Sequence, residues 1–480
     1  MVDPRGFLKV ARKNTEYRPI CERLDDHQEV FNLPSLEHSR EQASRCMDCA
    51  TPFCHWGCPL GNYIPEWNSY MFGDKWPQAV NLLEATNNLA EITGRVCPAV
   101  CEYSCVLGLN SEAVTIRENE LALIEAGFKN GLIKPKTPTW HSGKKVALVG
   151  SGPAGLSCAA QLNQAGHKVV VFERDQKPGG ILRYGIPDFK LEKWILDRRI
   201  EILKKEGIQF KTGFNVEAKN FSLLQKDFDA VCLTGGSDQP RDLKIPGREL
   251  KGIYFAMDYL SQANRLAAGE KIDQGQPIEV KGKKVVIIGG GDTGSDCLGT
   301  ALRQRAACLV QIELLPQPPE CRSQDFPWPH YPLILKTSSS HQEGGQRVWS
   351  VLTKSFIGKK GCLEKLSCVR VEFKKSNSKG CPIMKEIKGS EFQIEADIAI
   401  LALGFLHPRH SGLLSQLKVG LDARGNVKTD DSYRTSLEKV FSAGDMRRGQ
   451  SLVVWAIQEG RQAAFHIDKY LTGESDLGPI

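Results

Sequence analysis

The stretch KKVALVGSGPAGLSCAAQLNQAGHKVVVFE, from Lys144 to Glu173, decides the expected fold. It reads as a strand, a glycine-rich turn, a helix and a second strand that ends in an acidic residue. In such a unit the first glycine allows a tight turn, the second lets the backbone approach a pyrophosphate, and the third allows close helix–strand packing. The helix N-terminus faces the phosphates, and the terminal acid can accept hydrogen bonds from a ribose. The residues expected to bind a dinucleotide are Gly150, Gly152, Pro153, Ala154, Gly155 and Glu173.

The same pattern returns in KKVVIIGGGDTGSDCLGTALRQRAACLVQIELL, from Lys283 to Leu315. Two such units predict two dinucleotide-binding folds on parallel sheets, which is an α/β architecture. Glu313 lies near the end of the strand predicted over 308–315, where an acid suits a free 2′-hydroxyl and repels a 2′-phosphate. This favours NADH over NADPH, although a Glu313 that simply faces solvent would leave the choice open. The residues expected to hold the nicotinamide cofactor are Gly289, Gly291, Asp292, Thr293 and Gly294.

Two further segments favour FAD as the occupant of the first site. The run 440–445, VFSAGD, resembles the distal motif of two-dinucleotide flavoproteins, in which the Asp contacts the ribityl chain. Read alone, it could also be a strand-to-helix turn with Asp445 as an N-cap. The segment 177–185, KPGGILRYG, lies near the expected flavin position, or is a plain turn. The residues expected to contact the flavin from these two segments are Gly180, Leu182, Gly444 and Asp445.

Seven of the sixteen cysteines fall within sixty residues, with spacings of x2, x4 and x3 in the first group and x3 and x3 in the second. Clustered cysteines in a cytosolic chain bind metal more often than they form disulfides. The unequal spacings favour iron–sulfur clusters over zinc, which leaves a zinc site with free thiols as the alternative. A pair of four-iron clusters needs one ligand beyond these thiols, and a carboxylate on a nearby helix could supply it, unless that residue is a solvated helix glutamate. The candidate ligands are Cys46, Cys49, Cys54, Cys58, Cys97, Cys101, Cys105 and Glu120.

The composition is that of a water-soluble globular protein. The chain has 480 residues, is 41% hydrophobic and 25% charged, and carries a formal net charge of +7. The basic excess is mild and no basic run is interleaved with aromatics, so we expect no nucleic-acid partner. No apolar run reaches membrane-spanning length and residues 1–18 lack the apolar core of a secretory signal, so we expect a cytoplasmic protein.

The length predicts several domains, because a single core stops growing at roughly 250–300 residues. We expect a helical iron–sulfur domain followed by a flavin domain that is split by an inserted nicotinamide domain. The predicted ranges are 1–140 for the iron–sulfur domain, 144–250 for the first part of the FAD domain, 251–403 for the NAD(P)H domain and 404–480 for the second part of the FAD domain.

Long stretches of the chain resemble the small (beta) subunit of glutamate synthase and the NAD(P)H-oxidising C-terminal region of the fused eukaryotic enzyme. The resemblance covers nearly the whole chain and extends far beyond the cofactor fingerprints. The chain is also similar to the electron-entry half of dihydropyrimidine dehydrogenase. The stretches that carry the resemblance are CMDCATPFCHWGCPLGN (46–62), TGRVCPAVCE (93–102), GGILRYGIPDFK (179–190) and FSAGDMRRGQSLVVWAI (441–457).

The resemblance implies FAD, two 4Fe-4S clusters and NADH or NADPH as cofactors. It maps one cluster onto Cys46, Cys49, Cys54 and Cys105. It maps the other onto Cys58, Cys97, Cys101 and Glu120. Protein side chains would mainly position the cofactors, so no catalytic acid or base is named.

The function implied is that of an NAD(P)H-dependent oxidoreductase, the electron-input subunit of glutamate synthase. Electrons from NAD(P)H would pass through FAD and the clusters to a large (alpha) subunit that makes glutamate from glutamine and 2-oxoglutarate. One alternative is another NAD(P)H-dependent FAD and iron–sulfur electron transferase, linked to ferredoxin or sulfide. A second is an assembly subunit whose nucleotide sites no longer turn over.

Overall fold

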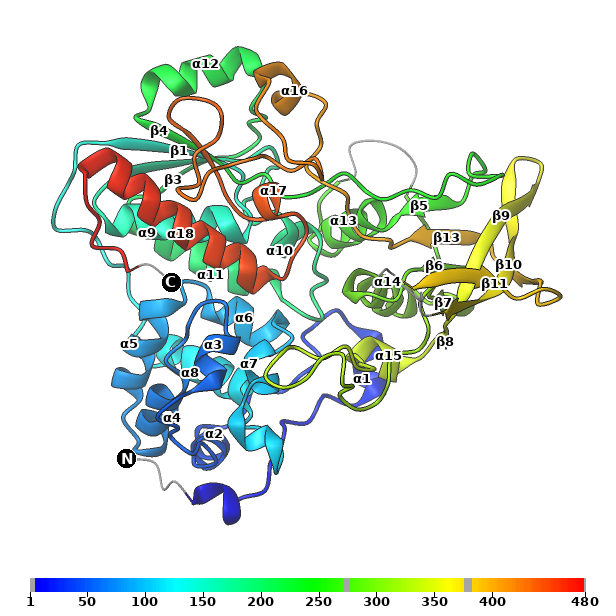
Figure 1. Ribbon diagram of the computed structural model, residues 1–480, viewed down its shortest axis with the longest axis horizontal. Coiled ribbons are helices and arrows are strands. Elements are labelled where there is room, and N and C mark those ends of the chain that lie inside the picture. The colour runs from blue at the N-terminus through cyan, green and yellow to red at the C-terminus, as the bar shows by residue number, and fades with distance from the viewer. Residues whose placement is uncertain (1–4, 272–276, 375–381, 479–480) are drawn as a thin grey trace.

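The computed structural model describes residues 5–271, 277–374 and 382–478 (Figure 1). A helical part at the N-terminus packs beside two parallel sheets, and a set of antiparallel strands extends from the second sheet. The predicted α/β architecture with a helical iron–sulfur domain is confirmed.

The N-terminal part consists of short helices, several of which begin at a proline or a capping serine. Pro65 and Pro77 lie in the first turns of their helices, where their missing N–H leaves no hydrogen bond unmade. Ser35 accepts a hydrogen bond from the backbone of His38 at 3.1 Å and so caps another. The helices are η1 (Gly6–Leu8), α1 (Ile20–Asp25), α2 (Leu36–Ala43), α3 (Phe53–Gly57), α4 (Ile64–Phe72), α5 (Trp76–Thr86), α6 (Ala90–Val96), α7 (Val100–Tyr103), η2 (Val106–Leu109) and α8 (Ile116–Lys129).

The first sheet has five parallel strands in the order β14-β4-β1-β2-β3. Its central strands are apolar runs that are buried almost throughout, as expected for a sheet covered on both faces. The strands are β1 (Lys145–Val149), β2 (Lys168–Phe172), β3 (Gln209–Lys211), β4 (Ala230–Leu233) and β14 (Val440–Ser442). The accompanying helices are α9 (Pro153–Gln164), α10 (Ile181–Tyr184), α11 (Lys193–Lys205), α12 (Ala218–Asp227), α16 (Leu413–Leu417), α17 (Asp445–Arg448) and α18 (Val453–Thr472).

The second sheet is also parallel, in the order β5-β13-β6-β7-β8. It lies between β4 and β14 in the sequence, so it is an insertion into the first fold. Its strands are β5 (Ile253–Phe255), β6 (Lys284–Ile288), β7 (Cys308–Ile312), β8 (Gln346–Val348) and β13 (Ile398–Leu401). Its helices are α13 (Ala256–Ala267), α14 (Asp292–Arg303) and α15 (Ser339–Glu343). The strand predicted over 308–315 ends at Ile312, three residues early, because Glu313 turns its carboxylate back to the backbone of Gly290 and Leu315.

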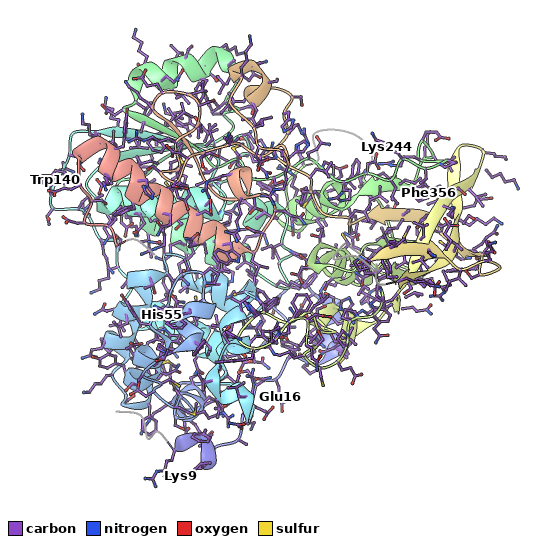
Figure 2. All side chains as sticks on the ribbon, viewed as in Figure 1. Lys9, Glu16, His55, Trp140, Lys244 and Phe356 are labelled. Carbon is purple, nitrogen blue, oxygen red and sulfur yellow. The ribbon has the colours of Figure 1, made fainter. Side chains whose placement is uncertain are left out.

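The antiparallel strands form an extension at one end of the molecule, on the far side of the second sheet from the first (Figure 1). The backbone N–H of Phe356 donates to the carbonyl of Pro246 at 2.9 Å, which ties β9 to the segment that leads into β5. Figure 2 shows Phe356 and Lys244 together at this end of the molecule. The strands are β9 (Val351–Lys359), β10 (Cys362–Lys374), β11 (Ile383–Glu386) and β12 (Phe392–Glu395).

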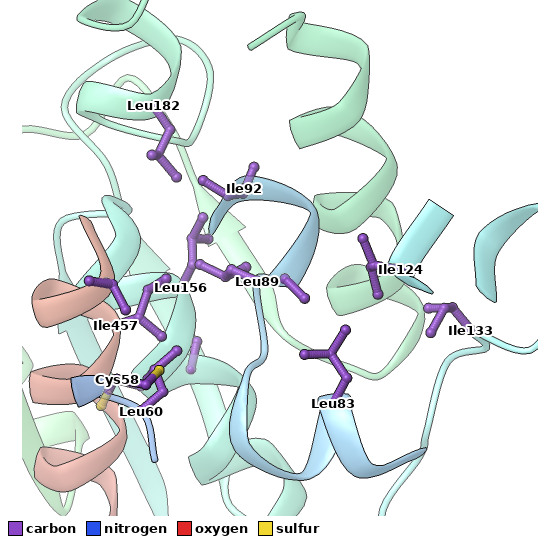
Figure 3. Packing of buried hydrophobic residues seen from close by; sticks show 14 of the residues in the cluster. Cys58, Leu60, Leu83, Leu89, Ile92, Ile124, Ile133, Leu156, Leu182 and Ile457 are labelled. Carbon is purple, nitrogen blue, oxygen red and sulfur yellow. The ribbon is translucent and has the colours of Figure 1, made fainter. Parts of the chain in front are cut away.

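One hydrophobic core joins the helical part to the first sheet. Figure 3 shows Cys58, Leu60 and Leu89 of the helical part beside Leu156 of α9 and Ile457 of α18. All five side chains are buried, with exposed fractions of 8% or less. The helical part and the first sheet, which with its helices we call the flavin-type fold, therefore have a fixed relative position.

Three thiols outside the two cysteine groups belong to the hydrophobic core. Cys158, Cys232 and Cys297 have exposed fractions of 0%. Within the described part of the chain, no helix is both long and apolar enough to cross a membrane.

Candidate cofactor-binding sites

The first glycine-rich turn divides its glycines between protein packing and open space. Gly150 has φ +109°, and a Cβ there would lie 2.6 Å from the carbonyl oxygen of Thr234. A Cβ at Gly155 would lie 2.1 Å from the carbonyl oxygen of Gly150. At Gly152 a Cβ would meet no atom within 4 Å. Packing thus requires the outer two glycines, whereas the middle one faces space that a pyrophosphate can occupy.

Glu173 follows β2 and is held by the turn itself. Its carboxylate accepts hydrogen bonds from the backbone of Ser151 at 3.1 Å and of Asp175 at 2.9 Å, and also from the Ser151 hydroxyl. Glu173 is buried, with an exposed fraction of 5%, yet it lines the cavity described next. This placement orients a carboxylate beside the turn, where a ribose of the dinucleotide would lie.

A cavity of about 1590 Å³ opens beside this turn. It exceeds the roughly 300–1,000 Å³ of an ordinary ligand pocket, as an extended dinucleotide requires. Thr293 of the second glycine turn lines the same cavity, so the two turns share one space. The predicted residues that line it are Gly150, Gly152, Pro153, Ala154, Glu173, Gly180, Thr293 and Asp445.

Two predicted flavin residues have packing roles, and their contact with the flavin stays a prediction. Leu182 is fully buried in the hydrophobic core and its side chain does not line the cavity. Gly444 has φ +71°, and a Cβ there would lie 2.6 Å from the Cβ of Ala154, so it lets α17 approach α9. Burial raises the pKa of Asp445 to about 6, opposed by hydrogen bonds from Ser451. At a bound flavin, which stays a prediction for this residue, Asp445 would therefore act as an acceptor or a donor, depending on pH.

Sequence reasoning missed two residues at the rim of this cavity. Tyr184 lies within the predicted flavin segment but was not named as a contact, and the Arg265 guanidinium lies over its ring at 4.1 Å. Arg265 also pairs with Asp175 at 2.6 Å. Tyr184 could have been predicted from its place in the glycine-rich segment. Arg265 lies on α13, which accompanies the second sheet, and no sequence motif around it indicates a cofactor contact.

The second glycine-rich turn repeats the geometry of the first. A Cβ at Gly289 would lie 2.2 Å from the carbonyl oxygen of Ala402, and one at Gly294 would lie 2.3 Å from that of Gly289. Gly291 is again open, with no atom within 4 Å. Asp292 and Thr293 begin α14, and the Glu313 carboxylate accepts hydrogen bonds from Gly290 at 2.6 Å and Leu315 at 2.9 Å.

The cysteines and Glu120 line two separate small cavities in the helical part. Within the described residues no three His, Cys, Asp or Glu side chains converge closely enough to hold one metal ion. Each set instead lines a cavity. The first cavity is lined by Cys46, Cys49, Cys54 and Cys105. The second is lined by Cys58, Cys97, Cys101 and Glu120.

Burial disfavours the charged form of thiols in both cavities. It raises the pKa of Cys46 and Cys58 to about 12 and that of Cys97 to about 11. Thiolates at these positions therefore need a bound cationic centre, which an iron–sulfur cluster supplies. The donor set thus fits two four-iron clusters, one in each cavity.

Glu120 is not a solvated helix glutamate, because its exposed fraction is 7%. Its carboxylate accepts hydrogen bonds from the Thr93 hydroxyl, from Asn62 at 3.1 Å and from Asn87 at 3.5 Å. Burial raises its pKa to about 7. Three side chains therefore orient a buried carboxylate toward a cavity that three cysteines share, and Glu120 as a cluster ligand stays a prediction.

Comparison with known families defines the class of protein. Residues 144–460 match the family described as pyridine nucleotide-disulphide oxidoreductase. Residues 23–131 match the family described as dihydropyrimidine dehydrogenase domain II, 4Fe-4S cluster. The chain is thus an NAD(P)H-dependent oxidoreductase with an iron–sulfur domain.

Full-length relatives narrow the class to one family. The chain is 50% identical to the glutamate synthase [NADPH] small chain of Mycobacterium tuberculosis, over 99% of this chain and 98% of that one. It is 43% identical to that of Bacillus subtilis, over 99% and 100%. The chain belongs to the glutamate synthase small-chain family.

Two further similarities have narrower meaning. The glutamate synthase [NADH] of Schizosaccharomyces pombe is 46% identical over 98% of this chain, which spans only 23% of that protein. Mycobacterium tuberculosis FprA in complex with NADPH has a similar structure, with a TM-score of 0.55 and 18% identity over 69% of this chain and 85% of that one. The latter shows a shared fold alone.

We predict that Gly152→Ala abolishes or strongly weakens FAD binding without lowering the melting temperature of the apoprotein. The added methyl group meets no protein atom, but it occupies the space that the pyrophosphate needs. Gly291→Ala is the matched variant, which should retain FAD and weaken only the nicotinamide cofactor. Flavin absorbance after gel filtration measures the first effect, and full FAD retention by Gly152→Ala would contradict the assignment.

We predict that Cys101→Ser lowers bound iron and acid-labile sulfide by about half, because one of two clusters loses a ligand. The exposed Cys362 provides a control, since Cys362→Ser leaves both cavities intact. Iron and sulfide analysis of anaerobically purified protein makes the measurement. Zinc in place of iron in the parent protein would refute the cluster assignment.

Proposed function

We propose that this chain is the electron-input subunit of a glutamate synthase. It would oxidise NAD(P)H and pass the electrons to a large subunit that forms glutamate from glutamine and 2-oxoglutarate. The observation that carries this proposal is the shared cavity, in which the second glycine turn opens through Thr293 onto the lining of the first. A nicotinamide and a flavin bound to these turns would meet within one shared cavity.

The chain's own residues bind and orient the cofactors. The α9 N-terminus and the open backbone at Gly152 would hold the FAD pyrophosphate, and Glu173 its ribose. The α14 N-terminus and the open backbone at Gly291 would do the same for NAD(P)H. Bound FAD accepts a hydride and releases electrons singly, and 4Fe-4S clusters accept single electrons.

The positions of the two thiol-lined cavities support a relay that leads away from the flavin. Val454 of α18, which belongs to the flavin-type fold, lines the cavity of Cys58, Cys97, Cys101 and Glu120. Among the residues that the structure describes, none from the flavin-type fold lines the cavity of Cys46, Cys49, Cys54 and Cys105. Cys49 is only partly buried. We infer that the Glu120 cavity receives electrons first and that the Cys49 cavity passes them on.

The partner and the location are part of the same proposal. Relayed electrons need an acceptor, and the small-chain names of the relatives imply a large chain that provides one. The residues described here contain no membrane-crossing helix. We propose a cytoplasmic complex with a large glutamate synthase subunit.

The proposed nicotinamide preference is for NADH. The two oxygens of the Glu313 carboxylate accept hydrogen bonds from the backbone N–H of Gly290, in the second glycine turn, and of Leu315, after β7, which fix the charge beside the ribose site. A fixed negative charge there accepts a 2′-hydroxyl and repels a 2′-phosphate. Relatives carry both cofactor names, so the preference needs its own test.

We predict that the parent protein, mixed anaerobically with NADH, loses its flavin absorbance, and that adding the large subunit gives NADH oxidation that requires both glutamine and 2-oxoglutarate. The large subunit alone is the control, and it should not oxidise NADH. Flavin reduction without any coupling to the large subunit would point instead to another acceptor, such as ferredoxin. No flavin reduction by NADH or NADPH would exclude an electron-input role.

We predict that Glu313→Ala narrows the preference for NADH over NADPH by roughly tenfold or more in kcat/KM, because it removes a fixed charge from the 2′ position. Glu320 lies further along the same loop and is exposed, so Glu320→Ala serves as the control. Initial rates with both cofactors and an artificial acceptor give the ratio. A parent enzyme with a strong NADPH preference would refute the role given to Glu313.

A further inference from the structure

An arm from the N-terminal part contacts the second parallel sheet and its helices, which we call the nicotinamide fold. We define the arm as residues 17–30. It is a loop closed at its base by a hydrogen bond from the Arg18 backbone to the Val30 carbonyl at 2.8 Å, and α1 lies at its tip. Figure 1 shows α1 beside α15, and helix contacts place it against both α14 and α15.

The base of the arm is fixed to the iron–sulfur and flavin parts. Glu29 pairs with Arg95 of α6 at 2.7 Å, and the Arg95 side chain is 1% exposed. Arg95 also pairs with Glu125 of α8 at 2.8 Å. The Val30 backbone donates to the carbonyl of Phe189 at 3.0 Å, in the segment that follows the flavin motif. The base of the arm is thus joined to α6 and α8 of the helical part and to the segment around Phe189.

The tip of the arm inserts a buried arginine into the nicotinamide fold. Arg23 lies 3.2 Å from the Glu343 carboxylate of α15, with side-chain exposures of 3% and 0%. Glu343 in turn accepts two hydrogen bonds from Arg303 of α14, at 2.7 and 3.2 Å. One buried carboxylate therefore joins an arginine of the arm to an arginine of α14.

Helix α14 is held at further points along its length. The Arg303 guanidinium lies 3.9 Å from the centre of the Phe189 ring. Lys190, the next residue, pairs with Asp296 one turn after the start of α14. Ser295 shares a hydrogen bond of 2.6 Å with Ser338, the residue that caps α15. The helix whose N-terminus would bind the NAD(P)H pyrophosphate is thus fixed against both the flavin segment and the arm.

The effect of Arg23 can be measured separately from the stability of the Arg303–Glu343 pair. Removing Glu343 would leave two arginines buried without a counter-charge, which is strongly destabilising. Removing the Arg23 charge leaves the two-point Arg303–Glu343 pair intact. The nicotinamide fold keeps its internal ion pair, and only the buried ion pair between the arm and Glu343 is lost.

We propose that Arg23 is a positioning residue for hydride transfer. Acting through Glu343 and Arg303, it holds α14 in the orientation in which the second glycine turn opens into the flavin cavity. Hydride transfer in one half of the chain thereby depends on an arm of the iron–sulfur half. The inference rests on the proposed NAD(P)H oxidation and names a residue outside both cofactor sites that this oxidation requires.

The test is the anaerobic rate of flavin reduction after rapid mixing of the full-length holoprotein with NADH. Arg23→Met keeps the apolar stem and removes the charge. We expect its limiting reduction rate to fall by roughly ten- to a hundredfold, the scale of a small misplacement of reacting groups. FAD content, iron content and the Kd for NADH from the concentration dependence should stay near the parent values.

The control is a substitution of Asp25, which lies on α1 together with Arg23. Asp25 pairs with Arg305, and both side chains are exposed, at 72% and 55%. Asp25→Asn should therefore leave the reduction rate unchanged. If Arg23→Met does not retain both kinds of cofactor, Arg23→Gln is measured in its place under the same criteria.

A rate equal to that of the parent, in a variant that retains its cofactors, would overturn the role of Arg23. A loss of NADH affinity with an unchanged limiting rate would also overturn it, because the effect would then lie in binding and not in orientation. If the parent protein itself is not reduced by NADH or NADPH, the proposed function fails, and that result is distinct from either outcome.

Discussion

A shared hydrophobic core between the thiol-rich helices and the first parallel sheet sets the position of every cofactor site. Leu60 and Leu89 from the helical part pack with Leu156 and Ile457 from the flavin-type fold, and all four are nearly inaccessible to solvent. Each such side chain stabilises the association by about 1.5–3 kcal/mol when fully buried. The helices that end in cysteines therefore cannot shift relative to α9 and α18 without opening this core. Electron transfer between cofactors depends on fixed separations, and the core provides them.

The nicotinamide fold is attached differently. It is an insertion between β4 and β14, and ion pairs are among the contacts that join it to the rest of the molecule. Arg265 pairs with Asp175 at the rim of the flavin cavity, where both side chains are about a quarter exposed. Arg23 and Glu343 meet on the opposite side with almost no exposure. Breaking a buried ion pair is strongly destabilising because it leaves an uncompensated charge, so such a pair favours one geometry. A partly exposed pair contributes little to stability. The buried side therefore defines the orientation of the domain.

Sequence reasoning predicted the fold because its signals are local. The two glycine turns and the strand at 440–442 are read from adjacent residues, and the structure has the elements there. The division of the cysteines between the two thiol-lined cavities could not be derived from their spacing in the sequence. Cys105 lines a cavity with Cys46 although fifty-nine positions separate them, and only the family resemblance grouped them in advance. Leu182 as a flavin contact stays a prediction, and the sequence did not show that its side chain lies in the hydrophobic core. No local pattern marks the contact between Arg23 and Glu343, which are far apart in the chain.

The central claim is that the two dinucleotide sites and the two thiol-lined cavities form a single path for electrons. Rapid-freeze electron paramagnetic resonance tests it most directly, on anaerobic holoprotein mixed with NADH or NADPH and without any other acceptor. The account predicts that bleaching of the flavin is followed by the signal of a reduced iron–sulfur cluster. A fully reduced flavin beside clusters that stay oxidised, although dithionite reduces them in the same sample, would contradict it.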